Sequence, residues 1–282
     1  MKKALLYLFM FIAVQFLASW AVYVPYLIIN GHTSAEVLDM FADKAPLPAD
    51  APMMLIAAAA YSVALLALFA WRKWCVVSPA YLRSRQWGVF FWTVFAALGT
   101  IIPSLWLQEQ LPELPDTMQA TFAMLIKSDY GYFILCIFAP IVEEMVFRGA
   151  ILRAILNIRF PSIFPGRKSG ACTTNGHWFA IIISALIFAA VHLNPAQMPH
   201  AFIIGLLLGW MYYRTGSILP GILFHWVNNT ATFVVARLFP DDTDGWLIDM
   251  LGGDHKRMVL SIIFSLFILL PSLYQLNMRM RR

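Results

Sequence analysis

The sequence consists of long apolar stretches separated by short polar segments. A helix needs about 20 mostly apolar residues to cross a bilayer, and eight stretches approach that length. They cover residues 4–29, 53–71, 87–107, 131–156, 178–193, 200–213, 218–239 and 258–276. The pattern therefore predicts an all-α fold, a polytopic bundle of about eight transmembrane helices.

Three shorter features refine this prediction. The first stretch follows Met1-Lys2-Lys3 like a signal peptide, but its apolar run is longer than a signal segment and no A-x-A site follows, so we expect a retained helix. Residues 194–199 contain two prolines and predict a tight turn. The semi-polar residues 117–126 predict an interfacial helix before the fourth stretch.

The composition agrees with a membrane protein. Of the 282 residues, 61% are hydrophobic and 12% are charged, whereas soluble domains are about 45–50% apolar and about 25% charged. So few charges cannot cover the surface of a soluble globule, and the chain is too apolar to be disordered. The composition therefore indicates an integral membrane protein.

The charges indicate its orientation. When the loops are assigned to alternate sides, most of the 20 basic residues share the side of the N-terminus, and all but two of the 15 acidic residues face the other side. Basic loops stay cytoplasmic, so we expect both termini in the cytoplasm. The net charge of +5 then reflects topology, and we expect a lipid bilayer and no nucleic acid as partner. The unpaired spacing of Cys75, Cys136 and Cys172 predicts neither disulfides nor a zinc site.

The two remaining acidic residues, Glu143 and Glu144, lie inside the fourth stretch, with Glu143 about 18 Å from its outer start. Charges at this depth cost at least about 2.5–3.5 kcal/mol, so they usually face a partner or a cavity. Glu144 and Arg148 are four residues apart and share a helix face, which predicts an ion pair. Glu143 points elsewhere and is free to handle a proton. A purely structural ion-pair cluster is the alternative.

Two histidines lie in neighbouring apolar stretches. His192 ends the fifth stretch, and His225 shares a helix face with Asn229 in the seventh. Each histidine alone is also typical of a hydrogen bond between membrane helices. The GxxxG of Gly205 and Gly209 lets a neighbouring helix approach closely and can bring these residues together. Simple helix lengths nevertheless place His192 about 22 Å, and His225 only about 10 Å, from the inner ends of their stretches.

These side chains suit hydrolysis by water. A carboxylate and an imidazole can activate a water molecule, while a second imidazole and a carboxamide can stabilise an oxyanion. The set of Glu143, His192, His225 and Asn229 contains these groups. Glu143, His192 and His225 can instead bind zinc, which commonly takes two histidines, one glutamate and water. The HExxH, GxSG and GxGD patterns of other intramembrane proteases do not occur in the sequence.

The order of these residues resembles a known family. Three motifs, EExxxR, FxxxH and HxxxN, follow one another at Glu143-Glu144-Arg148, Phe188-His192 and His225-Asn229. This pattern is similar to that of the CAAX prenyl endopeptidase and bacteriocin-processing family of intramembrane proteases. The resemblance covers about residues 130–240 and implies a multi-helix membrane protease.

The resemblance also implies roles for single residues. Glu143 and His192 would orient the water, His225 and Asn229 would stabilise the oxyanion, and Glu144 and Arg148 would support them. We expect a glutamate-dependent enzyme without a cofactor, with a divalent metal such as zinc as the alternative. Its substrate would be a membrane-associated protein or peptide.

The chain is expected to have three parts: residues 1–129 with three helices and the interfacial segment, residues 130–240 as the protease core, and residues 241–282 with the last helix. The basic ends and the lack of a disulfide pattern favour a prokaryotic inner (plasma) membrane. Two other functions stay open: a proton-coupled transporter that uses the glutamate pair, and a catalytically idle immunity or scaffold protein.

Overall fold

The computed structural model describes most of the chain. The described residues are 1–42, 44–45, 47–48, 50–76, 79–158, 176–238 and 247–280. Cys172 lies outside these ranges, and so do Arg159, Arg167 and Lys168, which are among the basic residues predicted on the side of the N-terminus.

Helices make up all the regular structure of the described ranges. Two of them, η1 and η2, are π-helices. The elements in chain order are α1 (Lys2–Ile29), α2 (Ser34–Phe41), α3 (Ala51–Trp71), α4 (Pro79–Arg83), α5 (Trp87–Glu109), α6 (Gln119–Lys127), η1 (Phe133–Phe138), α7 (Ala139–Glu143), η2 (Glu144–Leu152), α8 (Arg153–Leu156), α9 (Gly176–Ala190), α10 (Met198–Thr215), α11 (Leu219–Leu238), α12 (Leu247–Met250) and α13 (His255–Arg279).

Each of the eight predicted apolar stretches is helical over most of its described length, although residues 191–193 and 218 lie outside the helices. Within the described ranges, four helices are long and apolar enough to cross a membrane, namely α1, α3, α5 and α13. The stretch 131–156 corresponds to the continuous series η1, α7, η2 and α8, and the remaining three correspond to α9, α10 and α11. The prediction of an all-helical membrane bundle is confirmed, while the crossing of eight helices stays a prediction.

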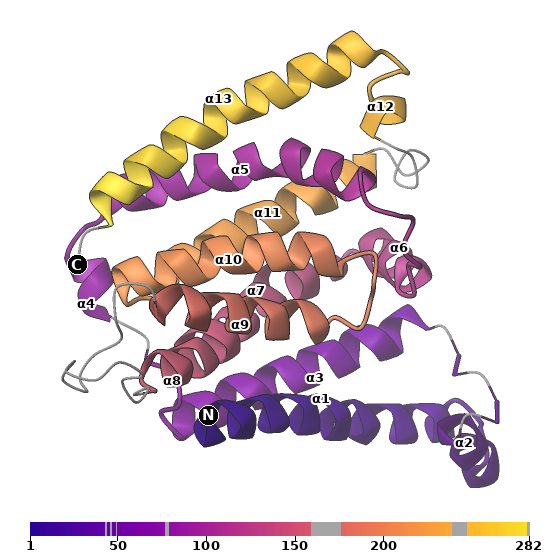
Figure 1. Ribbon diagram of the computed structural model, residues 1–282. Helices are drawn as coiled ribbons and strands as arrows, with labels where there is room; N and C mark the ends of the chain where they lie inside the picture. Colours follow the sequence, from indigo (N-terminus) through magenta and orange to yellow (C-terminus); the bar gives the residue numbers. More distant parts are fainter. Residues whose placement is uncertain are drawn as a thin grey trace.

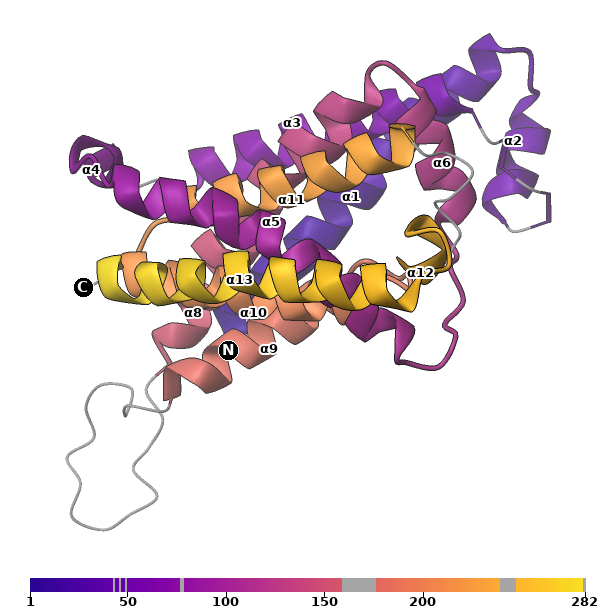
Figure 2. The same ribbon diagram turned by 90° about the horizontal axis from the view of Figure 1, so that it is seen from above.

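The helices form a bundle with two outer pairs (Figures 1 and 2). α1 packs along α3 on one side of the bundle, and α13 packs along α5 on the other. The series from η1 to α8, together with α9, α10 and α11, lies between these pairs. Successive long helices run in alternate directions, so the N-terminus and the end of α13 lie at the same end of the bundle. Which side of a membrane this end faces stays a prediction.

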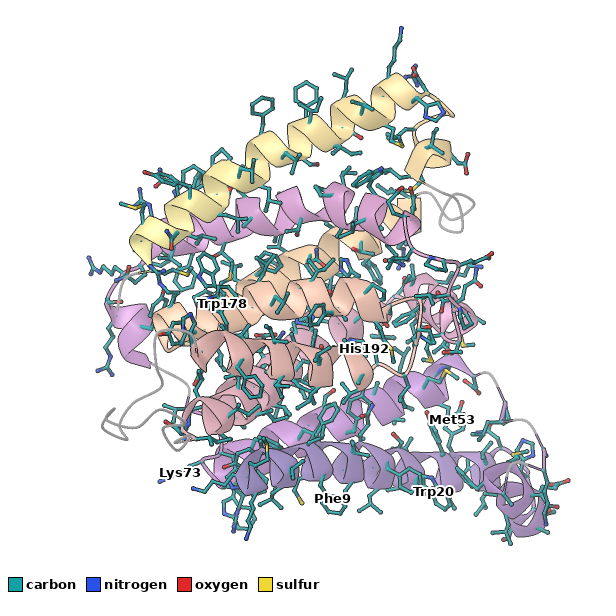
Figure 3. The ribbon with its side chains drawn as sticks, in the orientation of Figure 1. Phe9, Trp20, Met53, Lys73, Trp178 and His192 are labelled. Atoms are coloured by element: carbon teal, nitrogen blue, oxygen red, sulfur yellow. The ribbon has the colours of Figure 1, made fainter. Side chains whose placement is uncertain are left out.

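The outer helices present apolar side chains to their surroundings. Phe9 on α1 is 65% exposed and Phe267 on α13 is 72% exposed. Figure 3 shows Phe9 and Trp20 projecting from the outer side of α1. Continuous apolar surfaces of this kind are unfavourable in water but match the hydrocarbon interior of a bilayer. The protein is therefore a membrane protein whose outer helices contact lipid.

α9 and α10 approach each other closely at two glycines. A Cβ atom added to Gly205 would lie 3.0 Å from the Cβ of Ala185, and one added to Gly209 would lie 2.9 Å from Cγ2 of Ile181. The GxxxG pattern thus acts as predicted, because side chains at these two positions would push α9 away from α10. The predicted turn at 194–199 connects the same two helices, with α10 beginning at Met198.

We predict that Gly205→Val destabilises the protein by about 1–3 kcal/mol, because overpacking at this contact separates α9 from α10. Thermal unfolding in detergent micelles measures the effect. The control Ala67→Val adds similar bulk on the exposed side of α3 and should leave the unfolding temperature unchanged. Equal unfolding temperatures for both variants would contradict a close-packed α9–α10 contact.

Candidate active site

A buried ion pair lies at the centre of the bundle. Nη1 of Arg148 donates to Oε1 of Glu144 at 2.7 Å, and the two side chains are 1% and 0% exposed. Two other elements contact the guanidinium: the carbonyl of Gly205 accepts from Nη2 at 3.5 Å, and Phe188 places its ring 4.2 Å from Cζ. The ion pair predicted from the four-residue spacing is therefore confirmed, and it connects η2 with α9 and α10.

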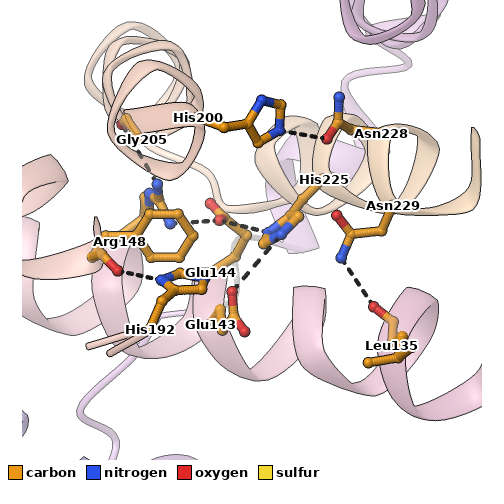
Figure 4. A network of polar contacts seen from close by, with 11 residues as sticks. Leu135, Glu143, Glu144, Arg148, His192, His200, Gly205, His225, Asn228 and Asn229 are labelled. Carbon is orange, nitrogen blue, oxygen red and sulfur yellow. Dashed lines mark hydrogen bonds and ion pairs between the residues drawn. The ribbon is translucent and has the colours of Figure 1, made fainter. Parts of the chain in front are cut away.

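Phe188 brings the two candidate histidines to this ion pair. Its ring centroid lies 4.9 Å from that of His192 and 5.9 Å from that of His225, both in edge-to-face geometry. One aromatic ring thus contacts Arg148, His192 and His225, which belong to three different segments of the chain. Figure 4 shows both histidines close to Glu143 and Glu144.

His225 lies between the two glutamates. Its Nε2 is 3.8 Å from Oε2 of Glu143, and its Nδ1 is 3.4 Å from Oε1 of Glu144 without hydrogen-bond geometry. Glu143 is 23% exposed and His225 is 8% exposed. The two glutamates therefore have different surroundings, as the sequence predicted: Glu144 pairs with Arg148, and Glu143 keeps a carboxylate oxygen near an imidazole.

A glycine allows α11 to reach the ion pair. A Cβ atom added to Gly221 would lie 2.6 Å from Oε2 of Glu144. Since Glu144 is held by Arg148 in a fully buried position, its side chain cannot move aside. Gly221 is one turn before His225, so the missing side chain also sets how closely His225 approaches the glutamates.

The orientation of His192 defines its protonation. α9 ends at Ala190, and His192 lies in the following turn, where its Nδ1 is 2.7 Å from the carbonyl oxygen of Phe188. A carbonyl can only accept, so Nδ1 carries the hydrogen and neutral His192 has its lone pair on Nε2. His192 can therefore accept a proton or a water hydrogen bond through Nε2.

The apparent difference in depth between the histidines has a structural explanation. Ser217 and Ile218, which precede α11, are buried at 0% and 3% exposure. The start of α11 is thus covered by neighbouring segments. Both histidines contact Phe188, so counting from the end of each stretch does not reproduce how α9 and α11 are shifted along each other.

Asn229 has a partner that the sequence did not suggest. Its Nδ2 donates to the carbonyl of Leu135 at 2.9 Å. In η1 the N–H of Ala139 bonds to the carbonyl of Ile134, so the next acceptor, Leu135, would need an N–H from Pro140, which has none. Asn229 therefore satisfies a carbonyl that the π-helix and the proline leave unpaired. Its role at an oxyanion stays a prediction.

Two further polar residues of the site were missed. The sequence analysis assigned no role to His200, but it lies in the first turn of α10, with Nε2 3.4 Å from Oδ1 of Asn228. Asn228 is buried and directly precedes Asn229. The pair of adjacent asparagines after His225 was the available signal, since two amides in an apolar helix need partners.

Unpaired polar atoms gather at this point. Buried side-chain polar atoms usually have a hydrogen-bond partner, so those without one indicate a place for water or ligand. Of the eight such atoms in the described residues, six belong to this network: Glu143 Oε2, Glu144 Oε2, Arg148 Nε, His200 Nδ1, His225 Nδ1 and Asn228 Nδ2. The network is thus prepared for polar contacts that the protein itself does not supply.

The described residues do not form a ready-made metal centre. Within the described ranges, no three His, Cys, Asp or Glu side chains are grouped as metal ligands. His192 donates Nδ1–H to a backbone carbonyl, which leaves Nε2 free for a water molecule or a metal ion, and Nε2 of His225 lies 3.8 Å from Oε2 of Glu143. Zinc binding by Glu143, His192 and His225 therefore stays an untested alternative.

The segment that carries this site is similar to a known protein family. Residues 128–231 match the family model of the type II CAAX prenyl endopeptidase Rce1-like proteins. This segment is therefore similar to the type II CAAX prenyl endopeptidases. The match contains all three motifs recognised in the sequence, whereas α1, α3, α5 and α13 lie outside it. No curated protein and no solved structure matches the chain.

We predict that Arg148→Met destabilises the protein by about 3–5 kcal/mol, because it leaves Glu144 charged and buried without its partner. Adding Glu144→Gln to this variant removes the unpaired charge and should restore most of the lost free energy of unfolding. Unfolding of both variants in detergent tests this. A double variant no more stable than the single one would show that the lost contacts of Arg148, rather than the unpaired charge, cause the effect.

Proposed function

We propose that the protein is an intramembrane endopeptidase that hydrolyses a peptide bond of a membrane-associated protein or peptide. One observation supports this most strongly: Glu143 Oε2 and His225 Nε2 lie 3.8 Å apart within the segment matched by a CAAX endopeptidase family. This distance is too long for a direct hydrogen bond, but one water molecule can contact both atoms.

In the proposed reaction, Glu143 is the general base. It takes a proton from the water, and the water oxygen attacks the carbonyl carbon of the scissile bond. His192 helps to orient the water through its Nε2 lone pair. The proton then passes from Glu143 to the amide nitrogen, the C–N bond breaks, and the products are a carboxylic acid and an amine.

His225 and Asn229 stabilise the oxyanion of the tetrahedral intermediate in this proposal. His225 must carry a hydrogen on Nε2 to donate, and Oε1 of Glu144 lies 3.4 Å from its Nδ1. Asn229 has a second amide hydrogen beyond the one that it donates to Leu135. Arg148 holds Glu144 in place beside His225, so the ion pair acts on the reaction through His225.

The catalytic type and the setting belong to the same proposal. We favour a glutamate-dependent reaction without a metal cofactor, in the inner (plasma) membrane of a prokaryote. The matched family is named for prenylated CAAX substrates, so a prenylated peptide is the natural first probe. The wider substrate class is a membrane-associated protein or peptide.

We predict that Glu143→Gln lowers kcat by about 100- to 10,000-fold, because an amide cannot accept the water proton. Cleavage of a prenylated CAAX peptide by protein in liposomes measures this, and accumulated precursors in the membrane proteome of Glu143→Gln cells provide a second readout. The control Glu113→Gln changes an exposed loop glutamate and should leave both readouts unchanged. A Glu143→Gln variant that cleaves normally and leaves no precursors would refute the proposed function.

We predict that extensive treatment with a zinc chelator leaves the cleavage rate within about twofold of the untreated protein, since Glu143 rather than a metal ion activates the water in the proposed reaction. Metal content measured on the same samples is the control. Loss of activity that returns on adding zinc would replace the glutamate reaction by a metal-dependent one.

A further inference from the structure

Two polar residues occupy the middle of apolar helices outside the matched segment. Gln15 lies near the centre of α1, and Tyr61 lies near the centre of α3. Polar side chains at such depth in a bilayer usually face a partner or a cavity, since lipid offers them no hydrogen bond. Neither side chain forms a hydrogen bond with another residue of the described part of the protein. The polar groups of both side chains are therefore available to a bound water molecule.

Both residues line one small cavity beside Glu143. The cavity has a volume of about 40 Å³ and is lined by Phe11, Gln15, Tyr61, Ala139, Val142 and Glu143. Its polar walls come from three elements, α1, α3 and α7. A water molecule occupies roughly 30 Å³ in the liquid and is bound where it meets two to four polar partners. The cavity therefore has the volume and the polar groups to bind one water.

The cavity and His225 contact Glu143 from different elements. α11, which carries His225, contributes no residue to the lining, whereas Oε2 of Glu143 lies 3.8 Å from His225 Nε2. Figure 4 shows Glu143 beside Glu144 and His225 at the edge of the polar network. A water in the cavity would thus bond to the carboxylate without taking the place of the attacking water.

We propose that Gln15 and Tyr61 are positioning residues, which orient the carboxylate of Glu143 through a water molecule in this cavity. The inference rests on the proposed function of Glu143 as general base. The Tyr61 hydroxyl and the Gln15 amide hold the water, and the water donates to the carboxylate, so that Oε2 faces His225. α1 and α3 therefore take part in the reaction although they lie outside the family match.

Tyr61→Phe and Gln15→Met test this role, because each removes one partner of the water and keeps nearly the same volume. We expect each to lower kcat for the prenylated CAAX peptide about 10-fold, the value of one hydrogen bond, with KM unchanged. The double variant should be little slower than either single one, since both act through one water.

Matched variants separate this effect from a general one. Tyr7→Phe makes the same chemical change in α1, at a buried tyrosine that packs against Phe69 and Trp74. It should leave kcat unchanged. Ala139→Val fills part of the cavity without removing any polar group, and it should lower kcat as much as Tyr61→Phe does. A rise in KM with normal kcat, or normal kcat in Tyr61→Phe, Gln15→Met and Ala139→Val alike, would overturn the proposal.

A readout without substrate distinguishes this inference from the proposed function. The infrared carboxyl bands of Glu143 are identified by their loss in Glu143→Gln, and we expect Tyr61→Phe to shift them while Tyr7→Phe does not. If Glu143→Gln cleaves normally, the proposed function fails, but the band shift still reports on the cavity water. If Glu143→Gln is inactive and Tyr61→Phe neither shifts the bands nor lowers kcat, the positioning role alone fails.

Discussion

The ion pair between Glu144 and Arg148 is the constraint on which the rest of the centre depends. Two charges in the apolar interior are tolerable only when they are paired and when their remaining donors and acceptors find partners. Arg148 therefore needs the carbonyl of Gly205 and the ring of Phe188. Glu144 in turn requires that Gly221 has no side chain. These contacts bring η2, α9, α10 and α11 together around the ion pair.

Irregular backbone gives the site its remaining geometry. The π-helices η1 and η2 flank the short α7, and Glu143 and Glu144 lie at the junction of α7 with η2. π-Helical turns are rare and concentrate at functional sites, because they leave backbone groups unpaired and redirect side chains. Here Asn229 pairs with the carbonyl of Leu135 and thereby connects α11 to the helix that carries both glutamates.

The N-terminal helices have two faces with different tasks. Phe9 of α1 is exposed where lipid would surround the protein, whereas Phe11 packs edge to face against Phe147 of η2. Gln15 follows on the packed side and lines the cavity beside Glu143, together with Tyr61 of α3. The same helix thus matches the bilayer on one side and reaches the candidate catalytic carboxylate on the other.

The sequence by itself determined the apolar stretches, the Glu144–Arg148 pair and the turn at 194–199, because these depend on hydrophobicity, charge and spacing along one segment. It did not determine the partner of Asn229, the contact of His200 with Asn228, or the meeting of Gln15 and Tyr61 at Glu143. Those contacts depend on backbone register and on where each helix begins. The contacts of His192 and His225 with Phe188 show why: they depend on how far α9 and α11 are shifted along each other, which no count along the sequence predicts.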